Sequence, residues 1–388
     1  MLASIAKDAL DRAWTDLERL SAGIGARVAG TADERTAAEM LTAAFAERGL
    51  DVIPRSFRWV GWEPIGQPHV EITLGDGSRR QLRTAPMAYT DSTPTGGVTG
   101  QLTPAGMCEL VPGLLAWPRY AVEQGGVPLA FIAVVPAGQA RPFPRPERQL
   151  LLEPIVIVGS DEFADIADRC ERGETLEATV ESQGRYVPGK TSTNVIAELP
   201  GASSETMVVS AHYDTVAGTP GAGDNASGVA GCLALAEHFA GHPLPKTLRF
   251  IAWGAHEFGL LGSQAYVQDL AQRGTLQPIT AALALDILSD GDRLGIWIGA
   301  EAFAADVAAS QATFPEGFPI ELFPRGRGET DSWSFAERGI DTAMLLTLPF
   351  SHFHLPEDTI DNNSRELFGF SVAVAQQVVE HLLARPAR

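Results

Sequence analysis

The sequence predicts an α/β fold: a three-layer α/β/α sandwich with a mostly parallel mixed sheet, plus a small β-rich inserted subdomain. From Thr193 onward, short apolar runs typical of strands alternate with longer amphipathic runs typical of helices. Between about Trp62 and Val187 the runs are short and β-rich, and turns rich in proline and glycine separate them. At 388 residues the chain is long enough for one large domain and a smaller one.

Residues 1–60 are predicted to open the larger domain with two helices followed by a strand. Apolar residues recur at helical spacing within residues 10–20 and again within residues 37–45. Thr31 or Asp33 is the candidate N-cap of the second helix, because both side chains can accept a backbone N–H.

Residues 61–189 are predicted to form the inserted β-rich subdomain. This stretch contains no concentrated cluster of histidines or acids, so no catalysis of its own is expected. Its strand candidates are His69–Leu74, Leu129–Val135, Ile155–Gly159 and Leu176–Val180, and its helical patterns cover Gly113–Gln124 and Ser160–Arg172.

Residues 190–388 are predicted to complete the larger domain as its catalytic part. In open α/β sheets ligands bind beyond the carboxyl ends of the strands, so those ends are where chemistry is expected. The strand candidates are Asn194–Leu199, Thr206–Ala211, Thr247–Trp253, Ala281–Leu285 and Thr342–Leu348. The helical patterns are Val229–Phe239, Ser263–Gln272, Glu301–Ala312, Asp331–Arg338 and Ser364–Leu383.

Composition narrows the possible partners. A net charge of −19 argues against nucleic acid or an anionic membrane surface, since both require clustered Lys and Arg. No run of 18 apolar residues is present, and the N-terminus has acids where a signal peptide needs an apolar core, so a cytoplasmic location is expected. The 3 cysteines are too widely spaced for a disulfide framework or a CxxC metal site.

Polar side chains with metal-ligand chemistry follow the predicted strands of the catalytic part. Two histidines and three carboxylates suit Zn²⁺, and a carboxylate can bridge two ions. Taken alone, each residue has a plainer explanation; Asp224, for example, is also a candidate N-cap of the following helix. Their placement at one edge of one sheet favours a metal site. The candidates are His212, Asp224, Glu257, Asp286 and His354.

These residues lie in segments that resemble the M28 family of zinc exopeptidases, which includes bacterial aminopeptidases and related carboxypeptidases. The resemblance covers residues 1–60 and 190–388, while residues 61–189 resemble a protease-associated domain in position and texture. The matching segments are His212-Tyr-Asp214, Gly221-Ala-Gly-Asp-Asn-Ala-Ser-Gly228, Glu257-Phe-Gly-Leu-Leu-Gly-Ser263, Asp286 and His354-Leu-Pro-Glu-Asp-Thr359.

The resemblance implies a role for each matched residue. His212 and Asp286 would bind one zinc ion, Glu257 and His354 a second, and Asp224 would bridge the two. Asp214 would orient the imidazole of His212. A hydroxide shared by the two ions would then attack a peptide bond at a chain terminus, and the expected target is the amino terminus of a short peptide or aminoacyl substrate. Mn²⁺ or Co²⁺ are alternative metals.

One residue departs from the family pattern at the catalytic position. The family has two consecutive glutamates, a general base and then a ligand, where this chain has His256-Glu257. A glutamate that takes a proton becomes neutral, whereas an imidazole becomes a cation beside two dications. Three interpretations stay open: His256 is a working base or acid, the site binds metal without efficient hydrolysis, or His256 points away or becomes an extra ligand.

These interpretations lead to three hypotheses about function. The first is a zinc aminopeptidase, and the second is a non-hydrolytic or weakly active metal-binding homologue. The third is other zinc-dependent amide chemistry, such as that of a carboxypeptidase, deacylase or cyclase.

Four further residues carry smaller predictions. Asp331 is a candidate to support the site or contact substrate, or else a helix cap. His354 is preferred to His352 as the ligand, because its spacing to Asp358 fits the family segment. Arg325 and Arg327 are candidates for binding a substrate carboxylate, although exposed loop arginines are common. Gly223 stands where the family often has a second acid, which we expect to weaken metal affinity slightly.

Overall fold

The chain forms two compact units, one inserted in the other. The computed structural model describes residues 3–111, 115–143, 153–299, 307, 311–324 and 330–385. The first unit comprises residues 1–58 and 191–388, and the second comprises residues 59–190. These divisions lie within two residues of the predicted ends of the insertion.

The first unit is built on a mixed sheet whose described strands run in the order β1-β10-β12-β11-β13-β16-β14-β15. The pairs β11–β12, β11–β13 and β13–β16 are parallel, and the pairs β10–β12 and β14–β16 are antiparallel. The strands are β1 (Asp51–Pro64), β10 (Gly184–Leu199), β11 (Ser203–His212), β12 (Lys246–Trp253), β13 (Ile279–Asp286), β14 (Arg293–Ile298), β15 (Ile320–Pro324) and β16 (Asp341–Leu348).

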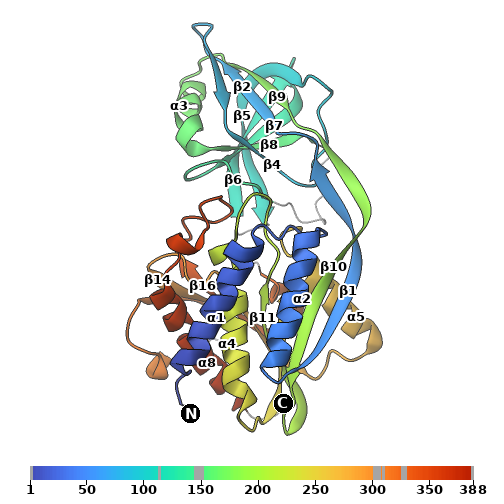
Figure 1. Cartoon of the computed structure of the whole chain (residues 1–388). Helices are drawn as coiled ribbons and strands as arrows, with labels where there is room; N and C mark the ends of the chain where they lie inside the picture. The colour runs from blue at the N-terminus through green and yellow to red at the C-terminus, as the bar shows by residue number, and fades with distance from the viewer. Residues whose placement is uncertain are drawn as a thin grey trace. The chain divides into compact units, whose positions relative to one another are not determined.

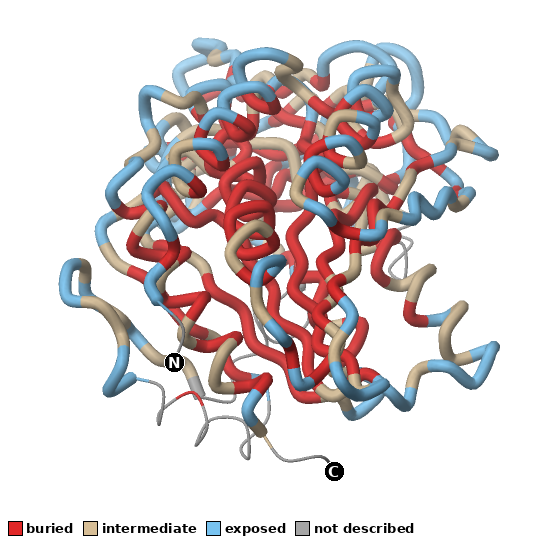
Figure 2. Tube along the Cα trace, turned by 60° about the horizontal axis from the view of Figure 1, so that its bottom comes forward, coloured by how far each residue is buried: buried red, intermediate tan, exposed pale blue. Residues whose placement is uncertain are grey.

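Helices cover both faces of this sheet, which gives the predicted three-layer sandwich (Figure 1). Side chains of β11 alternate between two apolar cores, as expected for a strand buried on both faces. Val209 packs with α1, α2, α4 and α8, whereas Val208 packs with α5 and α7. Figure 2 shows the buried residues concentrated in the central strands and the helix against them. The helices are α1 (Lys7–Glu18), α2 (Ala32–Glu47), α4 (Gly228–Ala240), α5 (Leu261–Arg273), α7 (Trp333–Ala336) and α8 (Arg365–Leu383).

Short helical turns and caps complete this unit. The Thr31 hydroxyl accepts the N–H of Glu34, so Thr31 rather than Asp33 caps α2. Ser364 caps α8 in the same way, by accepting the N–H of Leu367. The short turns are η1 (Arg19–Ile24), η2 (Ala222–Ser227), η3 (Gln311–Thr313) and η4 (Ile360–Asn362).

The second unit is a separate β-rich body with one described helix. Its strands run in the order β3-β2-β9-β5-β6-β7-β8-β4, and only the β7–β8 pair among the described pairings is parallel. Its elements are β2 (His69–Thr73), β3 (Arg79–Leu82), β4 (Thr84–Pro86), β5 (Val98–Val111), β6 (Leu115–Gln124), β7 (Val127–Val135), β8 (Ile155–Gly159), α3 (Ser160–Glu171) and β9 (Glu177–Glu181).

The helix predicted over residues 113–124 is wrong, because the described part of this stretch is strand β6. β6 pairs with β5 on one side and β7 on the other, so the sheet satisfies its backbone groups. Its side chains alternate between two cores, with Trp117 in one and Val122 in the other. Pairing with both neighbours overrides the local helical pattern.

Three smaller points complete the comparison with the sequence. The helix predicted over residues 331–338 is shorter, spanning only Trp333–Ala336. Most of the helix predicted over residues 301–312 lies outside the described residues. None of the described helices is long and apolar enough to cross a membrane.

Candidate metal centre

The five predicted ligands lie at the carboxyl edge of the central parallel strands. His212 is the last residue of β11, and Asp286 is the last residue of β13. Glu257 follows the end of β12, and His354 follows the end of β16. Because β12, β11, β13 and β16 run parallel, their carboxyl ends meet at one edge of the sheet.

Asp224 lies between the two histidines. Its Oδ1 is 3.1 Å from Nε2 of His212, and its Oδ2 is 3.3 Å from Nε2 of His354. Nε2 of His212 is also 3.6 Å from Oδ1 of Asp286, and Nε2 of His354 is 3.2 Å from Oε2 of Glu257. All five side chains are buried, and they form two pairs that share one carboxylate.

The donor set fits a divalent cation of zinc type. Candidate ligand atoms of His212, Asp224 and Glu257 all lie within 4.8 Å of one another, and so do those of His212, His256 and Asp286. Oε1 of Glu257 is buried and has no hydrogen-bond partner among the residues that the structure describes. A buried oxygen without a partner destabilises the folded state unless a ligand binds it. Imidazole and carboxylate donors together are characteristic of zinc sites.

Without an ion, the histidines hold protons between the acids. Burial opposes the charge on His354, but Glu257 and Asp224 outweigh it and raise its pKa to about 10. Burial likewise opposes the charge on His212, and hydrogen bonds to Asp224 and Asp286 raise its pKa well above the ordinary value. Metal binding must displace these protons, since only the neutral imidazole is a ligand.

The loop that carries Asp224 is fixed by Asp358. The Asp358 carboxylate accepts the N–H groups of Gly223 at 2.7 Å and Asp224 at 2.9 Å, and its carbonyl oxygen accepts the N–H of Ala222 at 3.1 Å. Asp224 does not cap the next helix, because the N–H of Gly228, where α4 begins, donates instead to Oδ1 of Asn225 at 2.9 Å. The space at Gly223 is tight, since a Cβ there would lie 3.0 Å from Oδ1 of Asn363 and 3.1 Å from Oδ1 of Asp358.

Asn225 joins this loop to the strand end that carries Asp286. Its Nδ2 donates to the carbonyl oxygen of Leu285 at 2.9 Å, and its Oδ1 accepts the N–H of Ile287 at 3.1 Å. The two bonds bracket Asp286. Asn225 therefore fixes the position of Asp224, the predicted bridging acid, relative to Asp286.

Asp214 supports the site mainly by binding the backbone that follows strand β12. Its carboxylate accepts the N–H groups of both His256 and Glu257, each at 3.0 Å. Nδ1 of His212 lies 3.1 Å from the carbonyl oxygen of Asp214, closer than its 3.8 Å distance to the carboxylate. The contact predicted to orient His212 is thus made by the Asp214 backbone. Burial raises the pKa of Asp214 to about 6.

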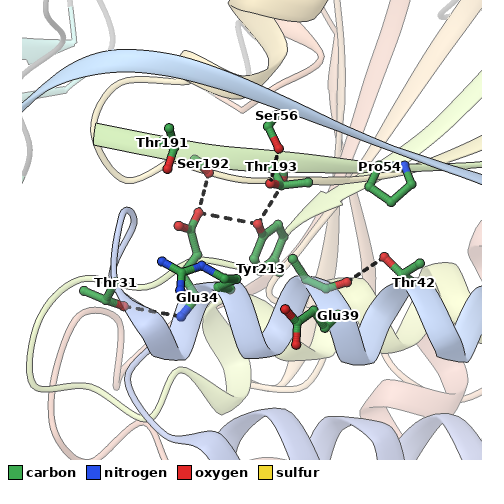
Figure 3. A pocket seen from close by; sticks show the side chains of 12 residues that line it. Thr31, Glu34, Glu39, Thr42, Pro54, Ser56, Thr191, Ser192, Thr193 and Tyr213 are labelled. Atoms are coloured by element: carbon green, nitrogen blue, oxygen red, sulfur yellow. Dashed lines mark hydrogen bonds between the residues drawn. The ribbon is translucent and has the colours of Figure 1, made fainter. Parts of the chain in front are cut away.

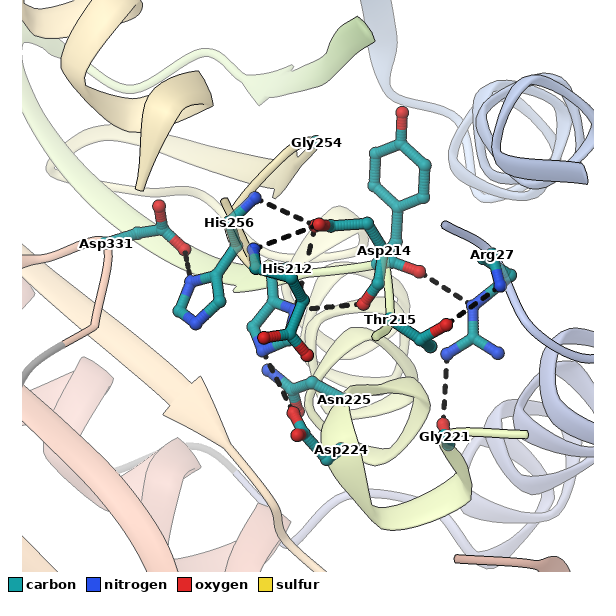
Figure 4. A network of polar contacts seen from close by, with 12 residues as sticks. Arg27, His212, Asp214, Thr215, Gly221, Asp224, Asn225, Gly254, His256 and Asp331 are labelled. Atoms are coloured by element: carbon teal, nitrogen blue, oxygen red, sulfur yellow. Dashed lines mark hydrogen bonds and ion pairs between the residues drawn. The ribbon is translucent and has the colours of Figure 1, made fainter. Parts of the chain in front are cut away.

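His256 stacks on His212 and is held by Asp331 (Figure 4). Its Nδ1 is 2.8 Å from Oδ2 of Asp331, which does not cap α7. Burial and His212 oppose its charge, but Asp331 outweighs them and raises the pKa of His256. The two rings are 3.6 Å apart and within 4° of parallel. A ligand lone pair lies in its ring plane and a Zn–N bond is about 2.0–2.1 Å long, so no ion can lie in both planes. In this arrangement His256 and His212 do not share an ion.

Strained backbone marks the same region. Five non-glycine residues of the described chain have positive φ. One is His354 itself (φ 60°), and Ala255 (φ 54°) and Ile287 (φ 46°) directly adjoin His256 and Asp286. Such conformations cost roughly 1–3 kcal/mol each and gather where a site must be held in a fixed geometry.

Several supporting residues were given no role by the sequence alone. The Thr330 hydroxyl donates to Oδ2 of Asp286 at 3.1 Å. His352 contacts Asp290 through its backbone N–H (2.9 Å) and its Nδ1 (3.4 Å). Asp290 and His352 lie close in sequence to predicted ligands, whereas Thr330 does not. Arg325 and Arg327 lie outside the described residues.

A cavity of about 410 Å³ lies in the same unit between α2, β1 and β10 (Figure 3). None of the five predicted ligands lines it. Its most buried acid is Glu34, whose carboxylate accepts hydrogen bonds from Ser192 and from the N–H of Gly30. The hydroxyl of Tyr213, which follows His212, donates to the carbonyl oxygen of Thr193 at 2.7 Å and lies 3.4 Å from the same carboxylate. Burial and the nearby Asp214 raise the pKa of Glu34 to about 7.

Comparison with known proteins matches one part of the chain to a family. Residues 194–379 match the model of peptidase family M28. They form an M28 peptidase domain. It contains all five predicted ligands, together with Asp214, His256 and Asp331.

Relatives of the M28 domain include named aminopeptidases. The aminopeptidase YwaD of Bacillus subtilis is 26% identical over 402 aligned positions, which cover 91% of this chain and 80% of that protein. A probable leucine aminopeptidase 2 of Arthroderma benhamiae is 31% identical over 169 positions, but these cover 41% of this chain and only 34% of that protein.

Solved structures show the same fold. An aminopeptidase from Aneurinibacillus sp. strain AM-1 superposes with a TM-score of 0.73 at 22% identity, over 97% of this chain and 94% of its own. The fold therefore extends beyond the M28 domain to the whole chain.

Proposed function

We propose that the protein is a metal-dependent aminopeptidase that uses two zinc ions. The observation that carries this proposal is Asp224, whose two carboxylate oxygens face the imidazoles of His212 and His354 from between them. His212 with Asp286 would hold one ion, and His354 with Glu257 the other. The names of the relatives support the choice of aminopeptidase within the family.

Zinc bound here would supply a Lewis acid and would lower the pKa of bound water toward neutrality. The protein's part is to hold the ligands in place. Asp358 fixes the loop of Asp224, Asn225 brackets Asp286, and Asp214 holds the backbone at Glu257. Because outer contacts of this kind set ligand orientation, each contributes to metal affinity.

We further propose that His256 accepts a proton during hydrolysis and that Asp331 makes this feasible. An imidazolium beside two dications is unfavourable by itself. The Asp331 carboxylate, 2.8 Å from Nδ1, offsets that charge and leaves Nε2 as the ring nitrogen for proton exchange. This pairing favours a working His256 over a ring that points away, and the parallel stacking on His212 argues against a role as an extra ligand of the same ion.

Metal titration tests the two-ion site. Protein stripped with a chelator should regain two equivalents of zinc and, with them, turnover of aminoacyl p-nitroanilides. N-acetylated peptides with a free carboxyl terminus, N-acyl amino acids and N-terminal glutamine peptides test the carboxypeptidase, deacylase and cyclase alternatives in the same assay. Binding of no zinc would refute the metal site, and turnover of only one of the other substrates would refute the aminopeptidase assignment.

Substitution of His256 tests its role. His256→Ala should lower kcat by about 10²–10⁴-fold while two zinc ions still bind. Asp331→Asn should lower kcat by a smaller factor through the same residue. The matched control is His352→Ala, which removes the other His–Asp pair near the site. An inactive wild type that gains activity as His256→Glu would instead support the non-hydrolytic metal-binding homologue.

A further inference from the structure

Arg27 is a fully buried arginine in the segment that joins η1 to α2, outside the M28 domain. All three guanidinium nitrogens donate hydrogen bonds, and every acceptor is a main-chain carbonyl oxygen. Figure 4 shows the bond to Gly221. The acceptors are Leu20 (3.3 Å), Gly25 (2.9 Å), Tyr213 (2.7 Å), Pro220 (2.7 Å) and Gly221 (3.0 Å).

Three of these acceptors belong to the loop between two predicted ligands. The chain leaves β11 at His212 and reaches Asp224 through residues 213–223. Arg27 binds the carbonyl oxygen of Tyr213, directly after His212, and those of residues 220 and 221, shortly before Asp224. One side chain therefore holds both ends of the connection.

The backbone of Arg27 strengthens the same attachment. Its N–H donates to the Thr215 hydroxyl at 2.9 Å, and its carbonyl oxygen accepts the N–H of Thr215 at 3.3 Å. Gly221 leaves room for this arrangement, because a Cβ there would lie 2.9 Å from Nη2 of Arg27 and 2.4 Å from Cγ2 of Thr215. Gly221 also has a φ of 62°, which favours glycine.

The charge of Arg27 faces the acids of the metal centre without pairing with any of them. Among the described residues no carboxylate forms an ion pair with its guanidinium, which is unusual for a buried arginine. Burial lowers the pKa of Arg27 to about 10, while Asp358, Asp214, Asp224 and Glu257 raise it, so the side chain is a cation at neutral pH. The positive charge of Arg27 therefore attracts these acids and offsets part of their mutual repulsion.

We propose that Arg27 is a positioning residue of the metal centre: it sets the span between His212 and Asp224 and supplies a fixed positive charge behind the ligands. This inference rests on the proposed metal site. Its consequence is that the N-terminal segment, although it contributes no predicted ligand, is part of what makes the site bind metal tightly.

The test compares Arg27→Lys and Arg27→Met with matched variants of Arg48. Arg48 is another buried arginine of the N-terminal segment, but it pairs with Asp16 at 2.8 Å and with Glu237 at 3.4 Å. Zinc affinity is measured by competition with a chromophoric chelator. The absorption spectrum of the Co²⁺-loaded protein reports ligand geometry, and thermal unfolding reports stability.

Arg27→Lys keeps the charge but has fewer donors, and should weaken zinc binding by about tenfold; Arg27→Met should weaken it by up to about 100-fold. Both should alter the Co²⁺ spectrum and lower kcat with little change in KM. The Arg48 variants should lose stability but keep zinc affinity within about twofold of wild type, a difference that corresponds to about 0.4 kcal/mol.

If Arg27→Met does not fold, Thr215→Val removes one attachment without removing the cation and should show a smaller loss of zinc affinity. Wild-type zinc affinity and an unchanged Co²⁺ spectrum in folded Arg27 variants would overturn the inference. So would Arg48 variants that lose zinc as readily. Failure of the wild-type protein to bind zinc would instead overturn the proposed metal site, and the inference with it.

Discussion

Replacing Glu34 by glutamine is expected to remove one defined part of the pH dependence of stability in the metal-free protein. Glu34 is 2% exposed and lies between α2 and β10, and its pKa is raised from 4.5 to about 7. A raised pKa means that the folded state binds the proton more tightly than the unfolded state. The stabilisation is therefore complete below about pH 4.5 and is lost as the pH rises through about 7.

The size of the effect follows from the shift. One pKa unit corresponds to 1.36 kcal/mol, so a shift from 4.5 to about 7 corresponds to about 3 kcal/mol in all. Between pH 5 and pH 8 about 2.5 kcal/mol of this is lost. Glutamine has no such proton, so the variant should gain about 2.5 kcal/mol relative to wild type over that interval.

Urea unfolding of chelator-treated protein at pH 5, 6, 7 and 8 measures this difference. Glu39→Gln is the control, because Glu39 is exposed on the same helix and lines the same cavity. A difference between wild type and Glu34→Gln that stays constant within about 0.5 kcal/mol from pH 5 to 8, or that changes in the opposite direction, would contradict the reasoning.

Three further predictions concern the site and the core. Asp358→Asn replaces one of the two carboxylate oxygens that accept N–H groups of the Asp224 loop, and it should weaken zinc binding by about 10–100-fold. The substitution Glu357→Gln at the neighbouring exposed residue should leave zinc binding unchanged. Equilibrium competition with a chelator measures both affinities. Asn225→Ala leaves buried backbone groups unpaired and should cost about 2–4 kcal/mol in urea unfolding; a loss below about 0.5 kcal/mol would show that the bonds to either side of Asp286 do not hold the loop. Burial raises the pKa of the Cys232 thiol, so it should react with a thiol reagent only after unfolding, and rapid labelling in the native protein would show that its surroundings open easily.

The sequence predicted the strands of the catalytic part well where one local rule dominates. The strand ending at Asp286 is an apolar run that closes on an acid, and the parallel sheet then places that acid beside His212. It predicted β6 wrongly because partners far along the chain, β5 and β7, determine its state. Periodicity within a dozen residues carries no information about such partners.

The supporting contacts of the site were harder to predict for the same reason. The sequence alone left Asp331 either as a residue that supports the site or contacts substrate or as a helix cap, and the fold places it 2.8 Å from His256. Arg27 lies 186 to 194 positions from the loop carbonyls that it binds. Nothing in the local sequence distinguishes it from a surface arginine. Residue types predict what chemistry a side chain can perform, but its partners depend on the complete fold.

The long separations around Asp224 also constrain the order of folding. Its loop is attached to Arg27 before the inserted unit and to Asp358 near the end of the chain, with the latter contacts spanning 134 and 135 positions. Contacts of such high sequence separation form late, because loop closure must precede them. During synthesis the inserted unit emerges before the ligand-bearing strands, and a complete ligand cage forms only when residues 354–358 are present. Tight zinc binding would thus report that the whole first unit has folded.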